Sequence, residues 1–155
     1  MAFTRADLDE YEVKAMFLIN FVKYVDWGAD VHGPVRIGIV GPSDIQPALE
    51  RIAAYKRNGT RPLEIVAYDA AHPVQCHVLF VSHANMSKAA ALARELAGRG
   101  VLIISEDNSS SSHAAGINLI RTDNKIKFEI NQASIRQAGL RLSGQLQQLA
   151  TVLNP

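Results

Sequence analysis

Three histidines and a cysteine lie close together in the sequence, and these side chains are common zinc ligands. They are His72, Cys76, His77 and His83. His77 and His83 share one face of an extended strand but lie about 20 Å apart along it, and Cys76 and His77 point to opposite faces. The spacing therefore favours surface or strand-edge histidines, and we predict no metal site.

Cys76 is the single cysteine of the chain, which excludes an internal disulfide and a cysteine-rich zinc site. It precedes the apolar run Val78–Val81 at the start of a predicted strand. We therefore favour a buried, inert thiol. An intermolecular disulfide is the alternative that the sequence leaves open.

Hydroxyls, an imidazole and two acids come together in the segment 105–113, which includes Glu106, Asp107 and His113. Nucleophilic catalysis needs such groups, but the nucleophile must be held rigidly against its base. Four consecutive serines at positions 109–112 are typical of a loop instead. The Gly-x-Ser-x-Gly turn of the serine hydrolases is also absent from the sequence. We therefore predict that the protein is not an enzyme.

Two glycines, Gly38 and Gly41, follow the pattern of a phosphate-binding turn after a strand. A dinucleotide fingerprint needs a third glycine, which is missing here, and Pro42 removes a backbone donor from the turn. The sequence therefore disfavours nucleotide binding, and we predict no cofactor.

A small-molecule pocket is a separate hypothesis for the same region. Gly41 and Ser43 follow one predicted strand, and Ser105 and Asp107 follow another. Ligands of open α/β sheets bind outside the carboxyl ends of the strands. These four residues are therefore the candidate ligand-pocket residues.

Strands and helices alternate through the first two thirds of the chain. Apolar runs rich in β-branched residues predict strands, and the segments between them carry helical periodicity. Such alternation predicts a mainly parallel sheet flanked by helices, joined by right-handed crossovers. The predicted strands are 35–40, 63–67, 77–82 and 101–104.

The pattern changes in the last third of the chain. Two strands, 116–121 and 125–130, flank the turn residues 122–124 and predict a β-hairpin. A short helix from Gln132 and a last helix capped by Ser143 are expected to follow. The fold class is therefore α/β, in a single domain over 1–155 with a C-terminal hairpin and two C-terminal helices.

Glu129 and Asn131 bracket Ile130 at the end of the hairpin. Glu129 could face solvent, or it could accept a hydrogen bond that ties the strand to the next helix. Asn131 has the residue type and position of that helix's N-cap. We favour a structural role for both residues.

The segment 10–27 predicts a helix with two apolar faces instead of one. One face consists of Tyr11, Ala15, Leu18, Val22 and Val25. The other consists of Val13, Phe17, Phe21 and Tyr24. Such a helix is either deeply buried or shared between a core and a partner. Trp27, which ends the segment just past the last helical residues, is a core residue or a binding hot spot.

The composition describes an ordinary soluble chain of 155 residues, with 48% hydrophobic and 20% charged residues. The net charge of +1 and the absence of a basic block predict no nucleic-acid binding. The longest apolar run, 13–25, contains Lys14, Asn20 and Lys23, so we predict no direct membrane insertion. A signal peptide is not visible, but a mature chain that begins after a removed signal would look the same.

Several segments together resemble the YfiR family, and the resemblance covers nearly the whole chain. The first and the last two of these segments are specific, whereas the middle ones could occur in any α/β protein. In chain order, the segments are Glu10–Trp27, Ile37–Gly41, Cys76–Ser82, Val101–Ser105, Phe128–Asn131 and Ala138–Ser143.

The resemblance implies a periplasmic regulator without catalytic activity, often a homodimer. Such proteins hold an inner-membrane diguanylate cyclase inactive by binding its sensory domain, and an outer-membrane lipoprotein relieves the inhibition. On this basis we expect Phe17, Phe21, Tyr24 and Trp27 to contact the partner. The chain departs from the family pattern where a glycine-rich segment is replaced by the serine-rich 108–113, and in having too few cysteines for the disulfides of some members.

Overall fold

The computed structural model describes residues 5–27, 33–55, 62–106, 114–122 and 125–153. The helices are α1 (Arg5–Lys23), α2 (Ile45–Tyr55), the 3-10 helix η1 (His83–Lys88), α3 (Ala89–Glu95), α4 (Gln132–Ala138) and α5 (Gly144–Leu149). The strands are β1 (Val25–Asp26), β2 (Val35–Val40), β3 (Leu63–Tyr68), β4 (Val78–Val81), β5 (Leu102–Glu106), β6 (Ile117–Thr122), β7 (Lys125–Asn131), β8 (Arg141–Leu142) and β9 (Thr151–Leu153).

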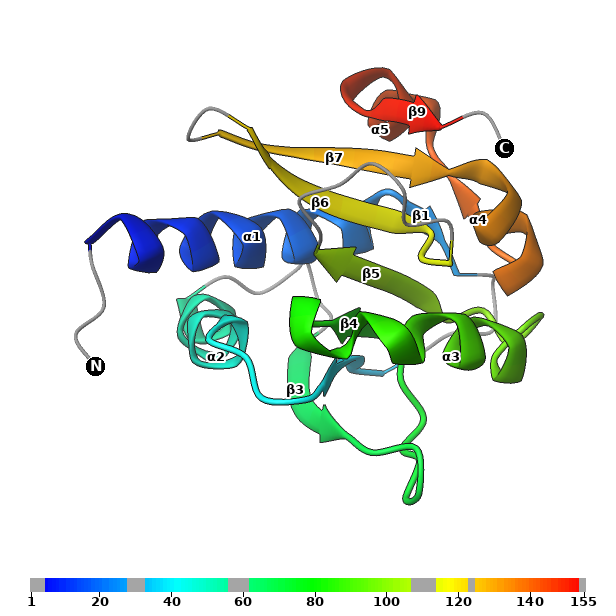
Figure 1. The fold of residues 1–155 in the computed structure, drawn as a ribbon, viewed down its shortest axis with the longest axis horizontal. Helices are drawn as coiled ribbons and strands as arrows, with labels where there is room; N and C mark the ends of the chain where they lie inside the picture. The colour runs from blue at the N-terminus through cyan, green and yellow to red at the C-terminus, as the bar shows by residue number, and fades with distance from the viewer. Residues whose placement is uncertain (1–4, 28–32, 56–61, 107–113, 123–124, 154–155) are drawn as a thin grey trace.

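Seven of the described strands form one twisted sheet in the order β3-β2-β4-β5-β6-β7-β9 (Figure 1). Neighbouring strands are parallel throughout, except that β6 and β7 form an antiparallel hairpin. The predicted α/β class is therefore confirmed, including the mainly parallel sheet, the hairpin and the two short C-terminal helices.

The central strands are apolar on both faces because both faces of the sheet are covered. All four residues of β4 are buried. On one face, Val78 and Phe80 pack with residues of α1 and α2, and on the other, Leu79 and Val81 pack with residues of α3. This is the pattern that buried parallel strands require. In Figure 1, α1 and α2 lie toward the left of the view, and α3 and α4 lie toward the right.

Two glycines end elements at positions where the backbone turns left-handed. Gly41, with φ +82°, follows β2, and a Cβ atom there would collide with the side chain of Asn85. Gly139, with φ +83°, ends α4 and lies against Gly98. Glycine adopts this conformation without the steric cost that other residues incur.

The small sheet formed by β1 and β8 was not predicted from the sequence. Val25 pairs with Leu142 and Asp26 with Arg141, and the backbone N–H of Ser143 donates to the carbonyl of Tyr24 at 2.8 Å. Each strand has only two residues, so no alternating pattern is long enough to reveal it. The pairing ties the end of α1 to the segment between α4 and α5.

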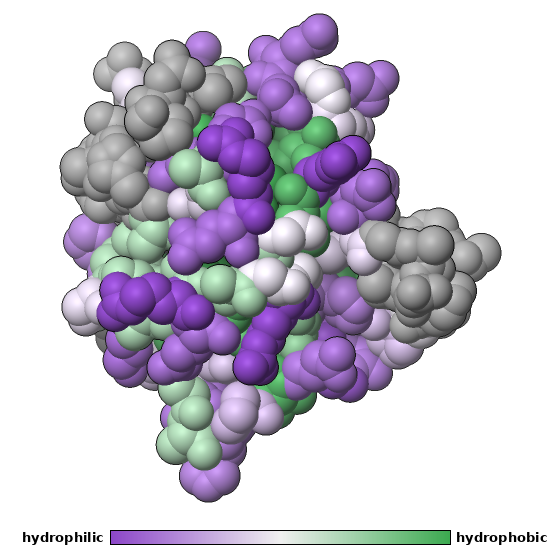
Figure 2. All heavy atoms as spheres, turned by 90° about the vertical axis from the view of Figure 1, so that its right-hand side faces the viewer, coloured by the Kyte–Doolittle hydropathy of each residue, from purple (hydrophilic) through white to green (hydrophobic). Residues whose placement is uncertain are grey.

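Figure 2 shows the side of the molecule that lies on the right of Figure 1. Hydrophobic residues appear there in separate patches among polar side chains, not as one continuous surface. Among the helices that the structure describes, none combines the length and apolar character that crossing a bilayer requires.

Candidate functional site

The second apolar face of α1 is packed partly against this chain's own sheet. Phe21 is 1% exposed, and its ring lies 4.9 Å from that of Phe128 on β7. Phe17 is half-buried and contacts both rings, with centroid distances of 5.8 Å to each. The three rings therefore fasten α1 to β7. Phe21 has almost no surface to offer a partner in the free chain.

An exposed apolar ridge begins where this aromatic packing ends. Val13 is 41% exposed and Met16 is 42% exposed, and both are among the few large hydrophobic residues at the surface. Together with the half-buried Phe17 they lie at helical steps of three and four, so they share one side of α1. We call Val13, Met16 and Phe17 the α1 ridge.

Tyr24 and Trp27 lie beyond the end of α1, and both are half-buried. The indole N–H of Trp27 donates to the carbonyl of Val22 at 3.1 Å, and its ring meets that of His77 edge-on at 5.7 Å. Trp27 therefore packs where β4 begins, whereas Phe17 and Phe21 pack on β7. The four aromatic residues do not form one cluster.

A buried ionic cluster, which the sequence did not predict, joins α1 to the sheet. The ammonium of Lys14 lies 2.7 Å from a carboxylate oxygen of Glu106 at the end of β5, and both side chains are 8% exposed. Lys14 also pairs with Glu10 at 3.3 Å, and Glu10 pairs with Arg121 of β6 at 3.0 Å. The backbone N–H of His83 donates to Glu106 at 3.3 Å. Charges buried this deeply need such partners.

A polar cavity of about 250 Å³ opens beside this ionic cluster. Charged side chains of α1, β5 and β6 line it, and Tyr11 and Leu119 supply its less polar walls. The cluster pairs two carboxylates with one ammonium and one guanidinium, so its charges balance. The arrangement stabilises the packing of α1 and leaves no excess charge to attract an ion.

Of the four residues of the predicted ligand pocket, the three that the structure describes are not brought together. Gly41 lines a cavity of about 510 Å³ with Tyr68 and Leu92, at the carboxyl ends of β2 and β3. Ser43 caps the start of α2, where its hydroxyl accepts a hydrogen bond from the N–H of Ile45 at 3.2 Å. Asp107 lies outside the described residues.

Ser105 belongs instead to a row of buried polar side chains that crosses the sheet. Its hydroxyl donates to Asn118 at 2.8 Å, and the amide of Asn118 donates to Glu129 at 3.1 Å. The three residues are neighbours in register on β5, β6 and β7, and Glu129 is 2% exposed. Two residues further along β7, the side chain of Asn131 accepts a hydrogen bond from the N–H of Ser134 at the start of α4.

The family of this chain follows from a comparison of its sequence with protein-family profiles. The profile of the YfiR/HmsC-like family matches residues 11–151, which extend from α1 to the first residue of β9. The chain belongs to the YfiR/HmsC-like family. A comparison with curated proteins gives no significant match. The resemblance seen in the sequence is therefore confirmed.

The YfiR/HmsC-like match includes both the aromatic packing of α1 and most of the ionic cluster, because it contains Lys14, Glu106 and Arg121. One feature of the sequence could have suggested a buried charge, although not its partners. Lys14 stands between Val13 and Ala15, which belong to the two apolar faces of the helix.

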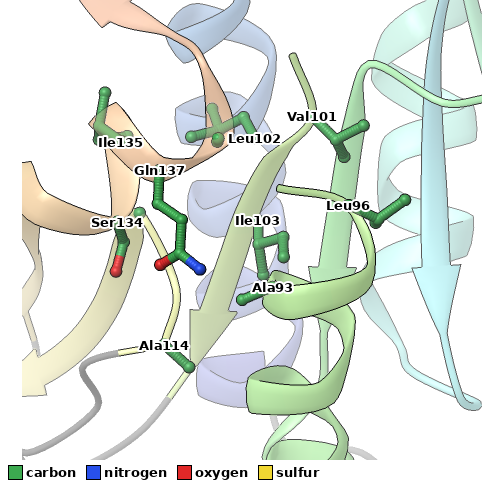
Figure 3. A pocket seen from close by; sticks show the side chains of 11 residues that line it. Ala93, Leu96, Val101, Leu102, Ile103, Ala114, Ser134, Ile135 and Gln137 are labelled. Atoms are coloured by element: carbon green, nitrogen blue, oxygen red, sulfur yellow. The ribbon is translucent and has the colours of Figure 1, made fainter. Parts of the chain in front are cut away.

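The crevice between α3, β5 and α4 is too small for a ligand of this YfiR/HmsC-like domain (Figure 3). Leu96, Ile103 and Ile135 are among the side chains around it, and its volume is about 10 Å³. A cavity needs roughly 10–15 Å³ to hold even one water molecule. We therefore exclude it as a binding site.

Proposed function

We propose that the chain is a periplasmic, non-enzymatic regulator that binds the sensory domain of an inner-membrane diguanylate cyclase and represses it. The observation that carries the proposal is the family match over residues 11–151. An outer-membrane lipoprotein that relieves the repression, and a homodimeric state, belong to the same proposal.

The mechanism is a shift of the cyclase population. A regulator that binds the inactive state ten times more tightly than the active state favours inactivity by about 1.4 kcal/mol. A regulator that binds both states equally shifts nothing, however tightly it binds. Repression of the cyclase therefore requires a surface that distinguishes the two states.

The α1 ridge is our choice for that surface, with Tyr24 and Trp27 as further contacts. Val13, Met16 and Phe17 offer apolar area on one side of a rigid helix, which suits recognition by a partner's apolar groove. Phe21, which we expected at the contact, would not touch the partner itself, but its ring would hold the stacked ring of Phe17 in place.

The test combines Met16→Lys with the matched control Ala54→Lys. Both positions are exposed on helices, and each follows a glutamate by four residues, so the new lysine should leave both helices intact. In cells that make the chain and the cyclase, wild type and Ala54→Lys should lower cyclic-di-GMP and Met16→Lys should not. Unchanged cyclic-di-GMP with wild type would refute the regulatory function. Full repression by Met16→Lys would refute only the choice of surface.

A ligand-sensing role is the second candidate, and the cavity beside Gly41 is the observation that favours it. Its volume of about 510 Å³ is in the range of small-molecule sites, and its walls include Tyr68, Leu92 and Lys88. Of the candidate ligand-pocket residues, Gly41 would contact the ligand, whereas Ser43 and Ser105 do not line this cavity. A metabolite that binds the folded chain there should raise its melting temperature.

A further inference from the structure

A separate cavity of about 450 Å³ lies at the opposite edge of the sheet, where β4 and β5 begin. His77, which precedes β4, and Val101, which precedes β5, both line it. Trp27 and Tyr68 add aromatic walls, so the cavity is enclosed by four separate parts of the chain. We call it the amino-edge cavity. It shares no residue with the α1 ridge, and Tyr68 is the one described lining residue that it shares with the cavity beside Gly41.

The lining of the amino-edge cavity contains an arginine, Arg99, and no acidic residue among the described residues. The guanidinium of Arg99 forms no ion pair with another described residue. An arginine that forms no ion pair with a described residue and lines a partly apolar cavity is suited to pair with an anion, which it can hold with two parallel hydrogen bonds.

The other polar groups of the cavity are neutral near pH 7. Burial raises the pKa of the Cys76 thiol to about 11, and burial likewise raises the pKa of the Tyr68 hydroxyl. His77 accepts a hydrogen bond at Nδ1 from the backbone N–H of Arg36, so that nitrogen carries no proton and the ring is uncharged. None of these groups would repel an anion.

The walls supply apolar area and one further donor. The indole N–H of Trp27 is already bonded to the carbonyl of Val22, so Trp27 presents only apolar ring surface to the cavity. Leu79 and Leu96 complete the apolar lining. Tyr68 is 8% exposed, and its hydroxyl makes no hydrogen bond to another described residue. It can therefore donate to a ligand.

We propose that the amino-edge cavity binds a small organic monoanion with an apolar body, whose acidic group pairs with Arg99. A zwitterion or an amine fits less well, because no described acidic side chain lines the cavity to receive a positive charge. The volume lies within the range of about 300–1,000 Å³ that is typical of small-molecule sites. The inference does not depend on the proposed function.

The test uses octanoate as probe and octylamine as its matched amine. Trp27 is the only tryptophan of the chain and lines the cavity, so its fluorescence reports binding directly. Octanoate should change the fluorescence saturably, and octylamine should not. Arg99→Gln should weaken octanoate binding at least tenfold. Arg94→Gln, an exposed arginine of α3 that does not line the cavity, should leave binding unchanged.

Isothermal titration calorimetry provides a second readout, because a ligand could bind without altering the indole. No binding of octanoate at millimolar concentration in either measurement would overturn the proposal. Equal binding of octylamine, or unchanged affinity in Arg99→Gln, would overturn it as well, since either result would mean that the cavity does not select for an anion.

Discussion

Replacing Lys14 with methionine should destabilise the protein strongly, because it removes one partner of a buried ion pair. Glu106 would keep only the N–H of His83 at 3.3 Å, in a site where its side chain is 8% exposed. Removing one member of a buried pair costs about 3–5 kcal/mol. We expect the lower end, about 3 kcal/mol, because Glu10 and Arg121 can still pair with each other.

The assay is urea unfolding followed by circular dichroism, with thermal unfolding as a check. For a chain of this size, a loss of about 3 kcal/mol corresponds to a drop in melting temperature of about 6–12 °C. The control is Arg51→Met, which breaks the exposed pair between α2 and Glu12 of α1. That pair has side chains that are 51% and 47% exposed, so its loss should cost less than about 1 kcal/mol.

The double variant Lys14→Met/Glu106→Met tests whether the lost stability comes from leaving Glu106 unpaired or from losing the lysine side chain itself. If the cost of the single variant comes from leaving Glu106 buried and unpaired, removing both charges should restore much of the stability. If Lys14→Met and Arg51→Met lowered the free energy of unfolding by the same amount, burial of the Lys14–Glu106 pair would make no difference, and the reasoning would be refuted. A double variant that is no more stable than Lys14→Met would refute it too.

Three further predictions concern single residues. Phe21→Ala should cost about 3–5 kcal/mol in urea unfolding, because it opens a cavity between α1 and β7. Gly41→Ala should cost about 1–3 kcal/mol in the same assay, because alanine must adopt φ +82° and its Cβ would collide with Asn85. The raised pKa of Cys76 means that the folded state holds the thiol proton more tightly than the unfolded state. Its contribution to stability should therefore be present below pH 9 and fall between pH 9 and about 11, and Cys76→Ala should remove this dependence in pH-resolved unfolding.

The sheet could be predicted from the sequence because its strands carry their own signal. Runs such as Val78–Val81 are apolar at every position, which indicates a strand that is buried on both faces. The starts of α4 and α5 were also visible, because Asn131 and Ser143 accept hydrogen bonds in the first turns of these helices. The order of the strands could not be predicted, since it depends on crossovers. As a result, Gly41 and Ser105 were placed in one pocket. In the structure Gly41 follows β2, whereas Ser105 lies within β5, and β4 stands between these two strands, so the residues are about 10 Å apart across the sheet.

The ionic cluster and the aromatic packing could not be predicted because their partners are distant in the sequence. Lys14 and Glu106 are separated by 92 residues, and no local pattern relates them. The second apolar face of α1 was visible as a surplus of hydrophobic residues. The sequence could not show that Phe128 of β7 would cover part of it.

The pairing of β1 with β8 has a consequence for how the chain reaches its native state. α1 is synthesised before β5, β7 and β8, which help to hold it in place and follow from residue 102 onward. Contacts between distant parts of a chain carry a loop-closure cost and slow folding. Until residue 128 is available, Phe17 and Phe21 of α1 lack the cover that Phe128 gives them, and until residue 142 is available, Val25 lacks its partner Leu142. Uncovered apolar side chains of α1 favour aggregation during that interval, so we expect folding of this domain to depend on protection of this helix.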